Sequence, residues 1–177
     1  MLSEFRSVAH RMPEVYGVIE SELHRGSIMA VSIQRVLFVT DFSEPARKAQ
    51  QYAVSLAETF GAQLYAFHAV SEEVFVPAPD TAVVWLHAEV ERARTALATE
   101  VARTSTTKPV IQEVRQGNAV QEIIRYAAEQ NIDLIVLATH GRTGLSRFLM
   151  GSVAEKVVRL ATCPVLTVHP TGHQFTL

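Results

Sequence analysis

Short apolar runs alternate with stretches of helical periodicity along most of this chain, and this alternation constrains its fold more than any other feature. The runs predicted to be strands are residues 36–39, 64–70, 110–114, 134–138 and 165–168. Continuous apolar runs of this length are typical of strands buried on both faces of a sheet. Strands that alternate with helices need right-handed crossovers, and they form a parallel sheet covered on both faces. The sequence therefore predicts an α/β fold with a doubly wound, mostly parallel five-stranded sheet sandwiched by helices.

Helical stretches follow the first four apolar runs. After the first run, Ser43 is a good N-cap, Pro45 suits a first helical turn, and apolar residues recur every three or four positions until Gly61. The last helix is predicted to begin near Ser152. The loop of residues 71–80 has no periodicity and is long for a connection from strand to helix, so we expect it to cover or flank a site.

Residues 1–32 lie outside this alternation and form a predicted N-terminal extension. Two short amphipathic stretches, separated at Pro13 and ended at Gly26, predict helices there. The extension either packs on the domain, mediates assembly or is weakly ordered, and the sequence leaves these three alternatives open. Residues 33–169 form the predicted domain, and residues 170–177 form a C-terminal tail.

Composition and charge argue against several classes of partner. The formal net charge is −2 and charged residues make up 19% of the chain, which lacks the concentrated positive charge that nucleic acids and anionic membranes attract. No apolar run approaches the roughly 20 residues that cross a bilayer. Cys163 is the only cysteine, which excludes an internal disulfide, and the histidines are too scattered for a metal site. We expect a cytoplasmic protein with no protein-bound metal, no nucleic-acid partner and no membrane partner.

Two strand ends carry distinctive polar residues. Residues 40–43 follow the first run, and residues 139–144 follow the fourth, with Gly151 and Ser152 further on at a helix start. Ligands of open parallel sheets bind beyond the carboxyl ends of strands, where the winding reverses, so the two loops share one pocket if their strands are neighbours. Glycines let the backbone approach an anion, and a helix start offers free N–H groups. The pattern predicts a phosphate site whose spacing differs from a P-loop and from a GxGxxG motif.

These residues also resemble the universal stress protein family over about residues 33–169. Its ATP-binding members carry Gly, two residues, Gly, nine residues, and then Gly-Ser or Gly-Thr. Gly141 and the pair Gly151-Ser152 match this pattern, whereas Ala138 stands in place of the first glycine. If position 138 needs a positive φ, alanine strains the backbone there, and if the position is extended, alanine is nearly harmless.

The resemblance implies a Rossmann-like fold of the adenine nucleotide alpha-hydrolase type, with an ATP site and a Mg or Mn ion held mainly by the phosphates. The polar turn after the first strand would face the adenine, the loop after the fourth strand would wrap the ribose and phosphates, and the last helix start would hold the phosphate chain. The implied nucleotide-binding residues are Thr40, Asp41, Ala69, Val70, Ala138, Thr139, His140, Gly141, Arg142, Gly151, Ser152 and Val153. From the residues alone, Asp41 is equally a cap for the first helix in company with Ser43.

The same resemblance implies a nucleotide-responsive stress regulator rather than a fast enzyme. No catalytic residue is predicted: His140 has no acidic neighbour in its loop to orient it, and His68 has the surroundings of a structural core histidine. ATP hydrolysis is expected to be slow at most. Two alternatives remain open, namely a nucleotide-free dimeric interaction scaffold and an ATP-dependent adenylyl-transfer enzyme with an acceptor pocket under residues 71–80. The sequence identifies no regulated protein partner.

The last strand predicts self-association. No helix follows Val165–Val168 to cover it, and an apolar sheet edge favours pairing with another strand. Members of the family commonly dimerise through their final strands. A homodimer through this strand is the expected assembly.

Overall fold

The computed structural model describes residues 32–71, 82–139 and 150–169. The chain divides into two units, Met1–Ser32 and Ile33–Leu177, and apart from Ser32 every described residue belongs to the second. The predicted helices of the N-terminal extension and the tail of residues 170–177 lie outside the described residues. In chain order the elements are β1 (Arg35–Val39), α3 (Glu44–Phe60), β2 (Gln63–Val70), α4 (Ala82–Val101), β3 (Ile111–Gln116), α5 (Ala119–Glu129), β4 (Leu134–Ala138), α6 (Ser152–Leu160) and β5 (Val165–Val168).

The five strands form one parallel sheet in the order β3-β2-β1-β4-β5. In central β1, Val36 lies opposite Leu64 of β2 on one side and opposite Leu134 of β4 on the other. The chain winds outward from β1 through β2 to β3, and then returns to the other side of β1 with β4 and β5, so the winding reverses between β1 and β4. This topology confirms the predicted doubly wound fold and makes neighbours of the two strands whose ends carry the polar loops.

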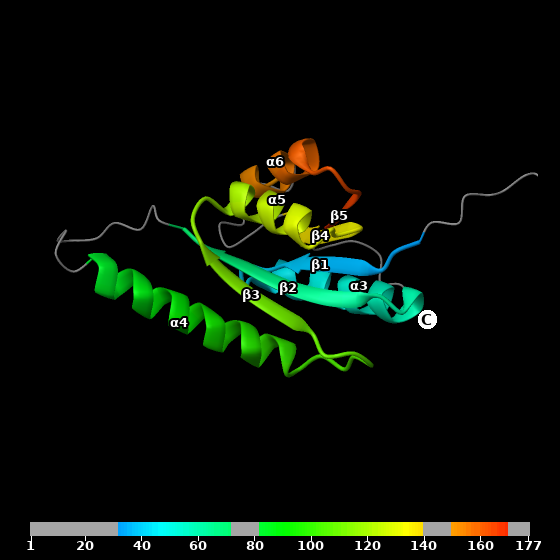
Figure 1. Cartoon of the computed structure of the whole chain (residues 1–177), viewed down its shortest axis with the longest axis horizontal. Coiled ribbons are helices and arrows are strands. Elements are labelled where there is room, and N and C mark those ends of the chain that lie inside the picture. Colours follow the sequence, from blue (N-terminus) through cyan, green and yellow to red (C-terminus); the bar gives the residue numbers. More distant parts are fainter. Residues whose placement is uncertain (1–31, 72–81, 140–149, 170–177) are drawn as a thin grey trace, which may run out of the picture. The chain divides into compact units, whose positions relative to one another are not determined.

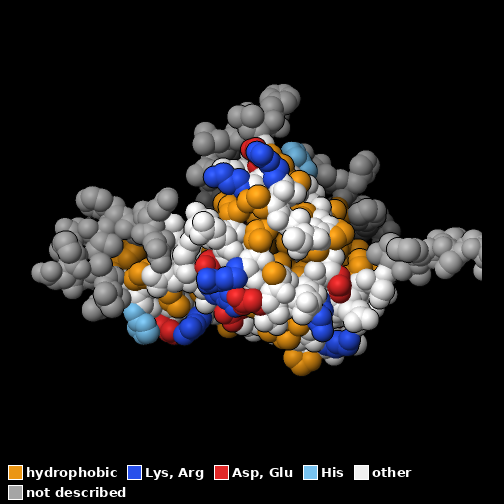
Figure 2. Space-filling model, turned by 45° about the horizontal axis from the view of Figure 1, so that its top comes forward, with side chains coloured by type: hydrophobic (Ala, Val, Ile, Leu, Met, Phe, Trp, Pro, Cys, Tyr) orange, Lys and Arg blue, Asp and Glu red, His pale blue; other side chains and the backbone are white. Residues whose placement is uncertain are grey.

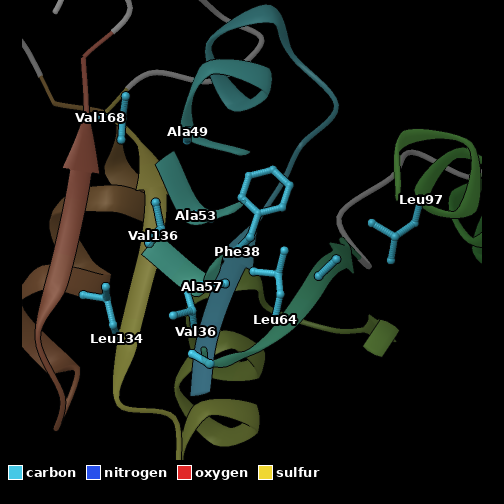
Figure 3. Close-up of a cluster of buried hydrophobic side chains, with 12 residues drawn as sticks. Val36, Phe38, Ala49, Ala53, Ala57, Leu64, Leu97, Leu134, Val136 and Val168 are labelled. Atoms are coloured by element: carbon cyan, nitrogen blue, oxygen red, sulfur yellow. The ribbon is translucent and has the colours of Figure 1, made fainter. Parts of the chain in front are cut away.

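Helices cover both faces of the sheet, with α3 and α4 on one face and α5 and α6 on the other (Figure 1). Consecutive side chains of a strand point to opposite faces. Val36 and Phe38 of β1 therefore pack toward α3, where Ala49 and Ala53 let the helix approach closely (Figure 3). Leu37 packs into the cluster beneath α5 and α6. All three β1 residues are at most 1% exposed, as a strand buried on both faces requires.

The helix boundaries follow the local signals expected for them. Ser43 Oγ accepts a hydrogen bond from Ala46 N at 3.3 Å at the start of α3, and Gly61, with φ of 61°, ends that helix. Asn118 Oδ1 accepts from Val120 N at 3.1 Å at the start of α5. Each cap satisfies backbone N–H groups that a helix terminus leaves without an intrahelical partner.

The third strand differs from the prediction in its bounds. An apolar run predicted residues 110–114, whereas β3 comprises Ile111–Gln116 and includes charged Glu113 and Arg115. β3 is an edge strand, so much of it stays at least partly exposed and a continuous apolar run is not required. The structure thus corrects the predicted end of this strand by two residues.

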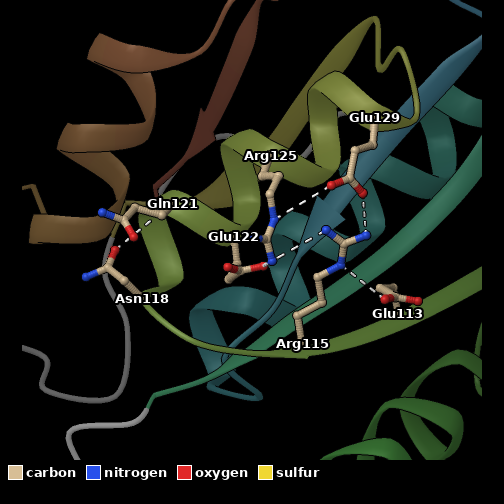
Figure 4. A network of polar contacts seen from close by, with 7 residues as sticks. All are labelled: Glu113, Arg115, Asn118, Gln121, Glu122, Arg125 and Glu129. Carbon is tan, nitrogen blue, oxygen red and sulfur yellow. Dashed lines mark hydrogen bonds and ion pairs between the residues drawn. The ribbon is translucent and has the colours of Figure 1, made fainter.

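A network of ion pairs ties β3 to α5 (Figure 4). The guanidinium of Arg115 lies 3.1 Å from Glu113 Oε1 and 2.6 Å from Glu129 Oε2, and its Cζ lies 4.7 Å from the ring centroid of Tyr126. The hydrogen bond from Arg115 holds the pKa of Glu129 below its usual value, and burial raises the pKa of Tyr126 to about 12. Glu122, only 7% exposed, pairs with Arg125 at the start of this network. These ion pairs thereby cover part of the edge strand β3 with charged side chains.

The surface of the described residues carries mixed charge on the face shown in Figure 2. Lys and Arg side chains lie apart from one another or beside Asp and Glu side chains on this face. Such a surface differs from the continuous basic patch that nucleic-acid backbones bind. Within the described ranges, none of the helices combines the length and the apolar composition needed to cross a membrane.

Candidate functional site

A cavity of about 270 Å³ lies at the carboxyl ends of β1, β2 and β4, against the starts of α5 and α6. This is the point of the sheet where the winding reverses and where open α/β sheets bind ligands. The described residues that line it are Val39, Thr40, Asp41, Ala46, His68, Ala69, Ala119, Ile123, Leu137, Ala138, Thr139, Gly151, Ser152, Val153 and Ala154.

Most of the residues that the sequence proposed for a nucleotide site meet at this cavity. Those that line it are Thr40, Asp41, Ala69, Ala138, Thr139, Gly151, Ser152 and Val153. Val70 is 4% exposed and is not among the described residues that line the cavity, so its contact with a nucleotide stays a prediction. His140, Gly141 and Arg142 lie outside the described residues, so their contacts stay predictions.

Hydrogen bonds within the turn from β1 to α3 position the polar residues of one cavity wall. Thr40 is 3% exposed, and its Oγ1 accepts from Phe42 N at 2.9 Å. Asp41 Oδ1 accepts from Ser43 N at 3.0 Å. Phe42 has a φ of 65°, which is uncommon for a residue other than glycine. Asp41 therefore shapes the turn and is also among the residues that line the cavity, while its contact with a ligand stays a prediction.

His68 belongs to the cavity wall although the sequence analysis did not place it there. Its Nδ1 lies 2.7 Å from the carbonyl oxygen of Thr40, and its ring centroid lies 4.4 Å from that of Phe42. Because a carbonyl oxygen can only accept a hydrogen bond, Nδ1 carries the proton. The sequence could have indicated this residue, because His68 stands near the end of β2, and β2 lies beside β1 with its polar residues at the end.

The start of α6 forms the opposite wall and offers backbone donors. Gly151 is the N-cap residue, and no side chain of the described residues caps this terminus. The amide of Gly151 is already used, because it donates to the Thr139 carbonyl at 2.7 Å. The N–H groups without an acceptor inside the helix are then those of Ser152, Val153 and Ala154, which all line the cavity. This terminus also carries the partial positive charge of the helix dipole, so it suits an anion.

Ala138 lies in β4 with ordinary strand geometry. It is opposite Val168 of β5, and it is absent from the residues with positive φ. Of the two alternatives for this position, the structure supports the extended one. Alanine in place of glycine therefore adds no backbone strain at this strand end.

The chemistry of the described lining residues suits binding more than catalysis. Asp41 is the one acidic side chain among them, and His68 is the one other titratable group. No group of three or more His, Cys, Asp or Glu that could hold a metal ion occurs in the described ranges. The wall thus combines apolar surface, a carboxylate, and N–H donors at a helix start.

These features place the protein among doubly wound α/β proteins, with a cavity at the topological switch point of the sheet. Comparisons with known proteins refine this class. The model of the universal stress protein family matches residues 32–169. Universal stress protein MJ0531 of Methanocaldococcus jannaschii is 33% identical over 157 residues, which cover 86% of this chain and 90% of the relative. The chain belongs to the universal stress protein family.

Solved structures agree with this assignment. The universal stress protein UspA from Lactobacillus plantarum superposes with a TM-score of 0.68 at 27% identity, covering 77% of this chain and 97% of that chain. A universal stress protein solved in complex with cAMP matches with a TM-score of 0.53 at 24% identity, covering 79% of this chain and 99% of that chain. The second likeness concerns the fold alone.

Proposed function

We propose that this protein binds an adenine nucleotide, ATP with a Mg²⁺ or Mn²⁺ ion, in the cavity between β1 and α6, and acts as a nucleotide-responsive stress regulator. The observation that carries the proposal is the start of α6, where no described side chain caps the helix and the N–H groups of Ser152, Val153 and Ala154 have no acceptor within the helix. A polyphosphate supplies oxygen acceptors and negative charge for such a terminus.

The opposite wall suits the base and sugar. Thr40, Asp41 and Ala69 lie at the ends of β1 and β2, where a carboxylate and small apolar side chains stand together. Sites for small ligands combine apolar walls with a few positioned polar groups in this way. The cAMP complex of a related protein supports the proposal at the level of the fold, because it shows that one member with this architecture was solved with an adenine nucleotide.

In this proposal the metal ion is held mainly by the phosphates of the nucleotide. Asp41 is the one carboxylate among the described lining residues, and a single carboxylate with substrate phosphates is a usual environment for Mg²⁺. When bound, the ion neutralises phosphate charge. The protein would bind the phosphates with the N–H groups at the start of α6, and the base and sugar with the residues at the end of β1.

We expect hydrolysis of ATP to be slow. Asp41 already accepts a hydrogen bond from Ser43 N, and Nδ1 of His68 is committed to the carbonyl of Thr40. In the proposal these contacts give both side chains a structural role instead of that of a general base. Binding rather than turnover then changes the surface presented to a regulated protein. A cytoplasmic location completes the proposal, in keeping with the single cysteine, Cys163.

Nucleotide released from gently purified protein tests this function. We expect mass spectrometry to find an adenine nucleotide, and calorimetry on the stripped protein to detect binding of ATP with Mg²⁺. AMP and ADP titrations then measure what each phosphate contributes. An absence of bound nucleotide together with no calorimetric signal would favour the dimeric scaffold instead. Release of pyrophosphate with an acceptor substrate would favour adenylyl transfer.

We also infer a homodimer through β5. Among the described strands β5 pairs with β4 alone, and Val165, Leu166 and Thr167 are each partly exposed. The carbonyl of Pro164 accepts from Ile135 N of β4, and that of Val168 accepts from Thr139 N just after β4. Alternation along the strand then directs the backbone groups of positions 165 and 167 away from β4, toward a second copy.

Thr167→Pro should weaken this dimer, because proline removes an outward N–H without removing a bond to β4. Thr167→Val keeps the N–H and is the matched control. Sedimentation velocity is expected to show a dimer for the wild type and the valine variant, and mostly monomer for the proline variant. A proline variant that is folded and still fully dimeric would place the interface elsewhere.

A further inference from the structure

The side chain of His68 joins the end of β2 to the turn that follows β1. The register of these two strands ends with Val39 opposite Phe67, and the Thr40 amide still donates to the Phe67 carbonyl at 3.0 Å. The carbonyl oxygen of Thr40 lies 2.7 Å from Nδ1 of His68. Because Thr40 is only 3% exposed, its carbonyl needs a donor from the protein, and the imidazole supplies one.

The same imidazole makes a second contact with this turn. Its ring centroid lies 4.4 Å from that of Phe42, and the planes of the two rings are tilted by 37°. Aromatic rings at such a separation attract each other. His68 therefore contacts the turn at two points, which are the backbone of Thr40 and the side chain of Phe42.

The turn that His68 contacts has an uncommon backbone conformation. Phe42 adopts a φ of 65°, and its amide donates to Thr40 Oγ1 at 2.9 Å. Residues other than glycine rarely adopt a positive φ, and such a conformation persists where surrounding contacts stabilise it. Asp41, which lines the cavity, lies between the two residues that His68 contacts. The contacts of His68 thus stabilise the chain on both sides of Asp41.

The place of His68 in β2 differs from that of a residue packed in the core. Residues 64–67 of this strand are buried, whereas His68 is partly exposed and lines the cavity with Ala69. A histidine that only filled space could be replaced by an apolar residue of similar size. A donor to the buried Thr40 carbonyl can be replaced only by another donor at the same place. The two roles therefore predict different effects of apolar and polar substitutions.

We propose that His68 is a positioning residue for the nucleotide cavity. It donates from Nδ1 to the Thr40 carbonyl and packs against Phe42, and it thereby holds the turn in the conformation that places Asp41 at the cavity wall. The inference rests on the nucleotide-binding function proposed above. It assigns to the end of β2 a part in ligand binding that acts through Asp41.

Two replacements of His68 separate its hydrogen bond from its bulk. Asparagine carries an N–H donor as many bonds from Cα as Nδ1, and leucine has a similar shape without the donor. His68→Leu should bind ATP with Mg²⁺ about tenfold more weakly in calorimetry, because the Thr40 carbonyl loses its donor. His68→Asn should stay within about threefold of the wild type. Equal affinities of these two variants would overturn the proposal.

His87→Leu is the matched control for these measurements. His87 is an exposed residue of α4 and is not among the described residues that line the nucleotide cavity. The same substitution there should leave the affinity for ATP unchanged. If His68→Leu fails to fold, His68→Gln takes its place, because its amide lies one methylene further from the backbone than that of asparagine. Binding by the glutamine variant as tight as by His68→Asn would then contradict the proposal.

A double-mutant cycle with Asp41→Ala tests whether His68 acts through Asp41. In the Asp41→Ala background, His68→Leu should cause a further loss of at most about twofold in affinity. A second loss of about tenfold in that background would show that His68 acts on the nucleotide by another route, and would overturn the positioning role.

Two measurements on the nucleotide-free protein follow the contact itself. NMR of the neutral imidazole should find the proton of His68 on Nδ1. Hydrogen exchange at the Phe42 amide should accelerate about tenfold in His68→Leu and stay near wild type in His68→Asn. If the wild type binds no nucleotide while these results hold, the nucleotide function fails and the support of the turn by His68 stands. A proton on Nε2, or unchanged exchange in His68→Leu, would remove that support whatever the nucleotide result.

Discussion

Valine at position 151 should lower the affinity for ATP at least about a hundredfold while the domain stays folded. Gly151 has φ of −59° and ψ of 143°, a conformation that valine adopts without strain. Its amide already donates to Thr139, and valine retains that N–H. In the proposed binding mode, however, the added side chain would compete with phosphate oxygens for the space within about 3 Å of the amides of Ser152 and Val153. Losing several charge-assisted hydrogen bonds accounts for the size of the effect.

Calorimetry with ATP and Mg²⁺ measures this loss, and urea unfolding checks that stability is unchanged. Gly151→Ala is the graded control, since one methyl group should reduce affinity less than the three carbons of valine. An effect that grows from alanine to valine is the signature of steric exclusion. A folded Gly151→Val protein that binds ATP normally would remove the assignment of phosphate binding to the start of α6.

The fold was predictable where local pattern and burial agree. The bounds of β4 match the predicted apolar run because its side chains are buried on both faces of the sheet, and those of β5 match because its four residues are uncharged, although it too is an edge strand. The predicted bounds of β3 were shifted because it lies at the sheet edge, where Glu113 and Arg115 find partners on α5 and within the strand. The pattern of a short stretch of sequence does not show which charged residues of another element will pair with it.

The candidate site was likewise predictable where its residues are contiguous in sequence, and was missed where they meet across the fold. The turn around Thr40 and the start of α6 at Gly151 are each contiguous in sequence, and the handedness of crossovers brought them to one cavity. His68 was missed as part of that wall because it meets Thr40 across a wide separation in sequence. Val70 was placed at the cavity by resemblance and is not among its described lining residues, so that placement stays a prediction.

Gly117→Ala should destabilise the protein by about 2–4 kcal/mol, well above the cost of the same change at Gly61. Gly117 joins β3 to α5 with a φ of 141°, which side chains rarely adopt, and its amide donates to Val70 O at 2.9 Å. A Cβ there would lie 3.1 Å from Glu122 Cγ and 3.2 Å from Glu122 Oε1. Glu122 would have to move away from Arg125 and disturb the network of Figure 4.

Gly61→Ala isolates the backbone contribution. Gly61 also has a positive φ, 61°, but a Cβ there would meet nothing within 4 Å, so we expect a cost of about 1 kcal/mol. Urea unfolding of both variants measures the difference. In a Glu122→Ala background the cost of Gly117→Ala should fall, because the clash is gone while the strain remains. Equal costs at the two glycines would mean that Glu122 yields freely, and that its buried ion pairs contribute little to the stability of the edge strand.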